Sequence, residues 1–274
     1  TEALIIGSLS CIIWTITLQT TIKYVYLVLK ADNRGEGGTF ALYALVRRHK
    51  KWLVLPAMIG GASLLADGII TPPISITSAV EGLRELPAFR GIEHYLLYIV
   101  LAILSFFFFL QQFGTASIGK FFGPIMFCWF SMLAVLGATH LFVFPGIFNA
   151  FNPYHAYQFL SQYPHAMWLL GAVFLCTTGA EALYSDLGHC GKKNIRISWI
   201  FVKTCLIINY LGQGAFLLAN RHGLTITDAA IERLGINAFY DLMPQWFIII
   251  GVVIATSAAI IASQAMISGS FTLI

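Results

Sequence analysis

Charged residues are scarce in this sequence. Aspartate, glutamate, lysine and arginine make up 10% of the 274 residues, whereas hydrophobic residues make up 58%. An ordinary soluble domain has about 25% charged residues. A chain with a mean hydropathy of +0.80 has too few of them to cover an apolar core with a charged surface. The composition therefore excludes a cytosolic enzyme, a nucleic-acid-binding protein and a disordered segment.

Two motifs of soluble biochemistry are also missing. The cysteines show no CxxC spacing and most lie in apolar runs, so neither a disulfide framework nor a zinc site is expected. The chain has no GxxxxGK(S/T) phosphate-binding loop, and therefore no visible ATP-driven motor. We expect a protein that is not an enzyme and that carries no cofactor. The five cysteines are Cys11, Cys128, Cys176, Cys190 and Cys205.

Long apolar stretches dominate the sequence instead. A bilayer core of about 30 Å needs about 20 apolar residues of helix, and lipid allows only helices or closed barrels to span it. None of the stretches alternates as a strand does. The expected fold class is an all-α polytopic membrane protein, with 1–274 as a single transmembrane domain. Seven stretches reach or approach the spanning length: Ala3–Leu29, Trp52–Val80, Tyr95–Phe113, Phe121–Phe144, Ala166–Leu187, Ser198–Leu218 and Pro244–Ile274.

Lysine and arginine are distributed unequally between the connections. Ten of the sixteen lie in the connections 30–51, 114–120 and 188–197, and four lie in the connections of the opposite side. An excess of basic residues predicts the cytoplasmic side, which places Thr1 outside. Because no signal peptide begins the chain, we expect a further span before Thr1. An apolar run ends at Ile274, so we expect an internal fragment of a larger membrane protein.

The first basic connection contains a glycine-rich loop, Ala31–Gly38. Its three glycines permit backbone conformations with positive φ. Its two acids, Asp32 and Glu36, can accept hydrogen bonds from neighbouring backbone groups. We expect this loop to be ordered and cytoplasmic.

Two acidic residues lie within predicted spans. Asp67 is near the middle of the second span, and Glu181 is in the fifth, shortly before a basic connection. An acid at the centre of a membrane helix costs about 2.5–3.5 kcal/mol on insertion scales. A residue with this cost normally faces a cavity and has a function. Both acids are therefore candidate site residues.

The neighbours of these acids are oxygen-rich and interrupt the helical pattern. Thr71 and Ser75 follow Asp67 by four and eight residues and share one helix face with it. The motif ADGIITPPIS adds a glycine and two prolines, which predict a break in the helix. In the fifth span, the motif TTGAE places Thr178 three residues before Glu181. Interrupted spans of this kind indicate the ion site of a transporter.

The chemistry of these side chains favours a hard, monovalent cation. All of the candidate ligands are oxygen atoms, which excludes a transition metal. Neutral oxygens with one or two carboxylates suit a monovalent ion better than calcium, although they do not separate potassium from sodium. Burial raises the pKa of an acid, whereas a nearby cation lowers it. Symport therefore needs the proton on a different acid from the one that faces the metal, and two acids on two spans permit this.

Several long motifs resemble those of a known family, and the match runs nearly end to end. The family is the Kup (KUP/HAK/KT) potassium uptake family. The motifs are ADNRGEGGTFALYAL (31–45), ADGIITPPISITSAVEGL (66–83), GTASIGKFFGPIMFCWF (114–130), FNPYHAYQF (151–159), GAEALYSDLGHCGKKNIRISW (179–199), NYLGQGAFLL (209–218) and IASQAMISGSF (261–271).

This resemblance implies a fold and a function. The family consists of proton-coupled potassium importers of the amino acid–polyamine–organocation (APC) superfamily. Their LeuT-like bundle has two inverted five-helix repeats, a five-plus-five arrangement with the first and sixth helices broken. The chain resembles family helices two to eight, so the first helix, the later helices and the C-terminal cytoplasmic domain would lie outside it. The implied setting is a multi-pass protein of the cell (plasma) membrane. Its partners would be potassium, protons and the lipid bilayer, with no nucleic acid, and the full-length protein would form a homodimer.

The resemblance also implies roles for individual residues. An acid in the third family helix and one in the sixth contribute to potassium binding and proton coupling, and they match Asp67 and Glu181. The hydroxyl groups of the same motifs match Thr71, Ser75 and Thr178. The expected potassium site consists of Asp67, Thr71, Ser75 and Thr178, with Glu181 as the proton-coupling acid. We expect these five side chains to converge on one polar region near the middle of the membrane.

Two other functions compete with potassium uptake. An amino-acid or other cation permease on the same fold needs room and a half-helix N-terminus for a carboxylate substrate, which acids at both interrupted spans would repel. A membrane scaffold or receptor without transport needs Asp67 and Glu181 to be paired with basic residues. Only Lys23 and Lys203 lie within spans and could serve as such partners.

Overall fold

The chain folds as a bundle of helices. The computed structural model describes residues 2–33, 35–47, 51–85, 93–111, 119–164, 166–180, 182–185, 187–220 and 237–271. Within these residues every regular element is helical, and the one isolated β-bridge joins Asn33 to Glu36. The all-α polytopic architecture predicted from the apolar stretches is confirmed.

Five helical segments in the described part are long and apolar enough to cross a membrane. They correspond to the first, second, fourth, sixth and seventh stretches of the sequence analysis. The third and fifth stretches form shorter apolar helices, Tyr95–Phe106 and Ala166–Leu175, so the number of crossings stays a prediction. The five segments are Glu2–Lys30, Lys51–Glu81, Lys120–Leu141, Lys192–Ala219 and Ile248–Ile267.

The first of these segments is not α-helical throughout. It starts as α1 (Glu2–Thr15), continues as the π-helical turns of η1 (Ile16–Leu27) and closes with the short η2 (Val28–Lys30). π-Helical turns are rare in proteins, and those that occur are frequently found at functional sites. Here they face the cavity described below.

The other helices follow in chain order. The long ones are α3 (Val54–Glu81), α4 (Glu93–Gln111), α5 (Gly119–Leu141), α10 (Lys192–Asn220) and α13 (Ile248–Phe271). The shorter ones are α2 (Thr39–Arg47), η6 (Pro145–Phe151), α6 (Pro153–Gln162), α7 (Ala166–Leu175), α8 (Ala182–Ser185), α9 (Leu187–Cys190) and α12 (Ala238–Asp241).

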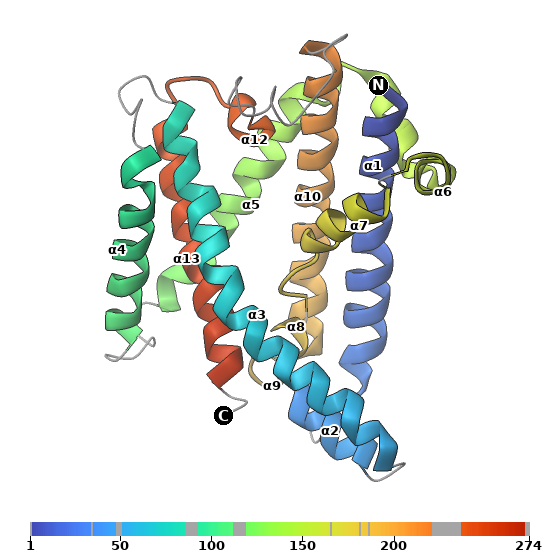
Figure 1. Ribbon diagram of the computed structural model, residues 1–274, viewed down its shortest axis with the longest axis vertical. Coiled ribbons are helices and arrows are strands. Elements are labelled where there is room, and N and C mark those ends of the chain that lie inside the picture. Colours follow the sequence, from blue (N-terminus) through green and yellow to red (C-terminus); the bar gives the residue numbers. More distant parts are fainter. Residues whose placement is uncertain are drawn as a thin grey trace.

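Two packed helix pairs form the frame of the bundle. Helix α3 packs along α13, and α5 packs along α10, while α1 lies beside α10 and contacts α6 and α7. Helices α2 and α9 lie at one end of the molecule, and α12 and the N-terminus lie at the other (Figure 1). The helices next to the basic connections therefore meet at one end, as expected for spans that alternate in direction.

The α5–α10 crossing depends on small residues. A Cβ atom on Gly137 would overlap the backbone of Ile208 and Asn209, and one on Gly212 would overlap the backbone of Gly137. Close approach through glycines is typical of membrane helices, where dispersion forces and hydrogen bonds take the place of the hydrophobic effect. The buried Asn209 uses this proximity, because its Nδ2 donates to the Leu133 carbonyl oxygen at 3.0 Å.

The predicted break in the second span is wrong. Helix α3 runs without interruption from Val54 to Glu81 and contains Pro72 and Pro73. Each proline removes one backbone N–H donor, but membrane helices tolerate this loss where neighbouring helices and hydroxyl groups compensate. Pro72 is fully buried within the bundle. Packing against α13 thus maintains the helix where the two prolines alone would predict its end.

Substitution of Gly137 by alanine should loosen the frame. The new methyl group would force α5 and α10 apart, and overpacking of this kind costs about 1–3 kcal/mol. We expect a lower unfolding temperature for the detergent-solubilised protein. Gly123→Ala, also on α5, is the matched control, because a Cβ atom there meets nothing within 4 Å. Equal melting temperatures for the two variants would contradict this account of the crossing.

Candidate functional site

A cavity of about 530 Å³ lies between the π-helical stretch, the first half of α3 and the α7–α8 junction. Its polar lining comes from three separate parts of the sequence: the first span, the second span and the interrupted fifth span. Asp67 is the one acidic residue among the described lining residues. The polar side chains that line the cavity are those of Gln19, Lys23, Tyr24, Ser63, Asp67, Thr177, Thr178 and Tyr184.

The interruption of the fifth span is confirmed. Helix α7 ends at Leu175, and α8 begins at Ala182. Residues 176–180 make tight turns, in which several backbone N–H groups bond to the carbonyl group three residues back, as from Thr178 to Leu175 at 3.1 Å. Gly179 has φ +88°, a conformation that glycine adopts without strain. The turns bring Thr177 and Thr178 to the wall of the cavity, where a continuous helix would separate them.

Asp67 has one satisfied and one unsatisfied carboxylate oxygen. The Thr71 hydroxyl, one helical turn further along α3, donates to Oδ1 at 2.5 Å. Oδ2 is buried and has no hydrogen-bond partner within the described part of the chain. A buried carboxylate oxygen without a partner is costly, because it has lost water and gained nothing in return. An oxygen in this position is suited to receive a cation.

Lys23 also lines the cavity but does not neutralise Asp67. Among the described residues no ion pair joins the two side chains. The Lys23 ammonium group lies 4.9 Å from the centre of the Tyr24 ring instead. The pairing that a scaffold without transport would require is not present between these two residues.

The structure brings some of the predicted site residues together and separates one of them. Asp67 and Thr178 line the same cavity, and Thr71 joins this group through its hydrogen bond to Asp67. Ser75 lines a second cavity of about 450 Å³, between α3, α5, α12 and α13. Glu181 lies outside the described residues.

Some of the cavity-lining residues were not found by sequence reasoning. Ser63 precedes Asp67 by four residues, so extending the Asp67–Thr71–Ser75 stripe backward along the helix would have identified it. Gln19 gave no signal, because a polar residue in a span becomes informative only when its neighbours in space are known. Tyr184 gave none either, because a tyrosine near a membrane interface is ordinary.

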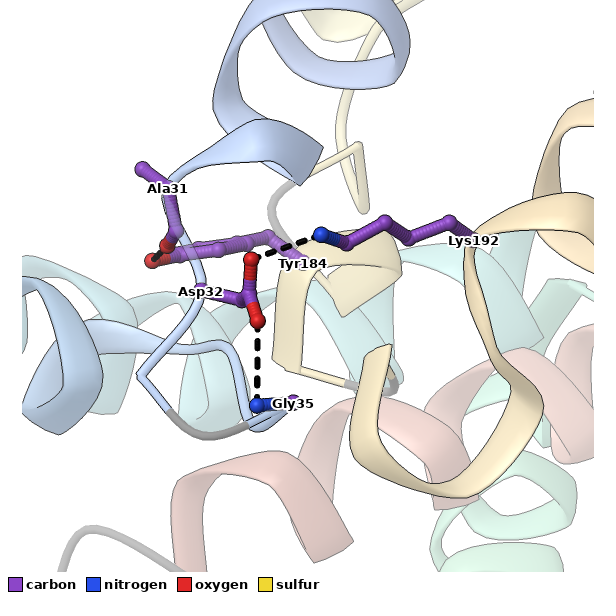
Figure 2. A network of polar contacts seen from close by, with 5 residues as sticks. All are labelled: Ala31, Asp32, Gly35, Tyr184 and Lys192. Atoms are coloured by element: carbon purple, nitrogen blue, oxygen red, sulfur yellow. Dashed lines mark hydrogen bonds and ion pairs between the residues drawn. The ribbon is translucent and has the colours of Figure 1, made fainter.

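A second polar network lies at the end of the molecule that holds α2 and α9, which we call the basic end (Figure 2). Through Tyr184 it adjoins the cavity. The Lys192 ammonium group forms an ion pair with Asp32 Oδ1 at 2.6 Å, and the Gly35 backbone N–H donates to Asp32 Oδ2 at 3.0 Å. The Tyr184 hydroxyl donates to the Ala31 carbonyl oxygen at 2.5 Å. As predicted, the glycine-rich loop is folded and Asp32 accepts a backbone hydrogen bond.

The ion pair is stable against moderate acidification. The hydrogen bond from Lys192, and then that from Gly35, lower the pKa of Asp32 below its usual value. A carboxylate with a depressed pKa in the folded state stabilises the fold above its unfolded pKa. This contribution is lost as the pH falls through the folded pKa. Since the unfolded value is about 3.9, the pair is fully formed throughout the neutral range.

Comparison with known proteins gives a consistent set of relatives. A family model described as "K+ potassium transporter integral membrane domain" matches residues 1–274. The chain is 58% identical over 273 residues to "Probable potassium transport system protein Kup" of Flavobacterium johnsoniae, covering 99% of this chain and 41% of that protein. A protein of the same name from Cytophaga hutchinsonii is 59% identical, and the match covers 100% of this chain and 40% of that protein. One from Clostridium perfringens is 53% identical, and the match covers 100% of this chain and 42% of that protein. The chain thus spans about two fifths of the length of these curated relatives. No solved structure matches it significantly.

Substitution of Gly179 should distort the interrupted span. A Cβ atom there meets nothing within 4 Å, so the effect of alanine is backbone strain alone. This strain amounts to about 1–2 kcal/mol. Gly179→Ala should lower the unfolding temperature in detergent, whereas Gly179→Asn should have a smaller effect because asparagine tolerates positive φ. Equal destabilisation by the two substitutions would contradict a role for φ at this position.

Proposed function

Because this chain belongs to the family of K+ potassium transporter integral membrane domains, we propose that the protein containing it moves potassium ions across a membrane. The chain is an integral membrane protein of a transporter family, not of an enzyme family. Its relatives are named potassium transport system proteins. The observation that carries the proposal is the buried, unpartnered Oδ2 of Asp67 in a cavity inside the helical bundle.

The chemistry of the cavity supports a monovalent cation as cargo. The described part of the chain contains no group of three or more His, Cys, Asp or Glu residues that could hold a metal. The cavity offers one carboxylate, from Asp67, and neutral hydroxyl oxygens, including that of Thr178. A site with a single negative charge balances a monovalent ion and leaves a divalent ion underneutralised. The family description and the names of the relatives support potassium as this ion.

We assign three of the predicted ligands, Asp67, Thr71 and Ser75, to one face of α3, and the fourth, Thr178, to the turn between α7 and α8. Ser63, Asp67, Thr71 and Ser75 are spaced by four residues, so they share one face of α3. This face borders the Asp67 cavity at Ser63 and the second cavity at Ser75. The Thr71 hydroxyl donates to Asp67 but keeps oxygen lone pairs for a cation. In the proposed path, the ion passes Ser75 and Thr71 and binds between Asp67 and Thr178.

Proton coupling is the second part of the proposal. Glu181 follows the turn that carries Thr177 and Thr178, three residues beyond Thr178 in the sequence. The Thr71 hydroxyl donates to one oxygen of Asp67 and the other oxygen has no partner among the described residues, which suits a cation ligand. A separate acid is then needed for the proton, and Glu181 is the proposed carrier. The function is therefore secondary active potassium uptake by K+:H+ symport.

The wider architecture is also proposed from the family resemblance. We infer a five-plus-five inverted-repeat bundle of the APC superfamily, in which this chain supplies about seven helices. The interruption between α7 and α8 supports this assignment, because that fold has a broken helix at the corresponding position. The proposed location is the cell membrane, and the proposed assembly of the full-length protein is a homodimer.

Growth rescue tests the function as a whole. The full-length protein is expressed in a bacterium that lacks its own potassium uptake systems. The proposal predicts growth at low potassium, and loss of this growth when the proton gradient is collapsed. Growth that fails at low potassium would overturn potassium uptake, whereas growth that persists without the gradient would overturn proton coupling alone.

Asp67→Asn should weaken potassium binding in the full-length protein. This substitution keeps the shape of the side chain and removes its charge. A unit charge about 4 Å from a cation contributes about 4 kcal/mol at an effective dielectric constant of 20, and desolvation offsets part of this. We expect the potassium concentration for half-maximal uptake to rise at least about tenfold. Glu81→Gln, at the other end of α3 and away from the Asp67 cavity, is the matched control and should leave this concentration unchanged. Equal values for Asp67→Asn and the parent would sink the site assignment.

Glu181→Gln should separate binding from coupling. Glutamine resembles a permanently protonated glutamate, so the proton can no longer leave. Potassium binding, measured by calorimetry, should stay close to that of the parent, whereas uptake driven by an imposed pH gradient should be lost. Glu181→Asp, which can still titrate, should retain part of the driven uptake. Uptake at the parental rate by Glu181→Gln would move the proton role to another residue.

A further inference from the structure

The loop between η2 and α2 is a folded unit at the basic end of the molecule. Asn33 and Glu36 exchange two backbone hydrogen bonds, of 2.9 and 3.1 Å. Gly35 and Gly38 have φ values of +89° and +93°, a conformation that glycine adopts without strain. The described residues of this loop, 31–33 and 35–38, therefore have one defined shape, and we call them the glycine loop.

Two side-chain contacts attach the glycine loop to the second half of the fifth span and the start of α10. One is the ion pair between Asp32 and Lys192, and the other is the hydrogen bond from Tyr184 to the Ala31 carbonyl oxygen (Figure 2). The two surfaces also fit closely. A Cβ atom on Gly37 would overlap the carbonyl oxygen of Tyr184. We call this pair of contacts the clasp.

The clasp is directly connected to the wall of the Asp67 cavity. Gly38, at the end of the glycine loop, and Leu42, in α2, line that cavity together with Tyr184. Tyr184 is buried in an apolar cluster with Val25 and Leu29 of the first span. The same tyrosine thus lines the cavity and holds the glycine loop with its hydroxyl group. Moving the glycine loop away from Tyr184 would open this wall toward the basic end.

The contacts are of the kind that can open and close. The ion pair lies at the surface, where such pairs contribute little to stability. Gating elements are drawn from such weakly stabilised parts of a protein.

We propose that the clasp is the gate of the Asp67 cavity on the basic side of the membrane, with Tyr184 as the positioning residue that transmits its state to the cavity wall. Closed, the clasp keeps the cavity separated from the solution at that end. Broken, it lets water and ions reach Asp67 from that side. The proposal rests on the proposed function for the identity of the ion, but not for the existence of the gate.

The test measures access to the cavity and needs no transport. A single cysteine replaces Ser63, which lines the cavity, in a cysteine-free version of the full-length protein. A membrane-impermeant thiol reagent is applied from the basic side in vesicles of defined orientation. Asp32→Asn, Lys192→Gln and Tyr184→Phe should each increase the labelling rate by about two- to fivefold, the effect expected for a weak surface contact.

Two neighbouring residues provide matched controls. Lys193→Gln removes a charge next to Lys192, and Glu36→Gln removes one from the glycine loop, but the clasp uses neither side chain. Both should label at the parental rate, and Lys193→Cys, on the exposed surface, reports delivery of the reagent. Unchanged labelling in all three clasp variants, or faster labelling in the controls, would overturn the gate. A protein that shows the gate but takes up no potassium would overturn the proposed function alone.

Discussion

The carboxylate of Asp67 is the constraint on which the rest of the structure depends. A charged group in a membrane bundle is costly unless another charge or several hydrogen bonds compensate it. Here a single hydroxyl donates to one oxygen, the other oxygen is buried without a partner, and Lys23 lies over an aromatic ring instead of pairing with it. An unneutralised acid of this kind is maintained when the missing partner is a transient one, and a transported cation is such a partner.

The helices around Asp67 are arranged to leave this site open. Two departures from regular α-helix border the cavity: the π-helical turns of η1 and the turns between α7 and α8. By contrast, the α5–α10 and α3–α13 pairs are closely packed and regular. Rigid pairs thus provide a frame, and the irregular backbone is confined to the cavity, where its polar groups can serve an ion.

Much of this arrangement follows from the sequence, and the failures have physical causes. Apolar runs predicted the helical spans, because lipid leaves the backbone no alternative, and the TTGAE motif predicted the interrupted fifth span. The break predicted at Pro72 and Pro73 is absent, because the rule that proline ends a helix is local and takes no account of packing against α13. Ser75 shares a helix face with Asp67, yet it faces another cavity, because eight residues of helix rise about 12 Å. The clasp between Asp32 and Lys192 joins residues 160 positions apart, and no pattern in the sequence pairs them.

A single experiment tests most directly whether the free oxygen of Asp67 receives the transported ion. Thallium, a monovalent ion that substitutes for potassium, scatters X-rays anomalously and can be located in crystals of the full-length protein. The account predicts a thallium peak within coordination distance of Asp67 Oδ2 and near the Thr178 hydroxyl, and loss of this peak in Asp67→Asn. A peak elsewhere in the bundle, with the Lys23 ammonium group in contact with Asp67, would contradict it.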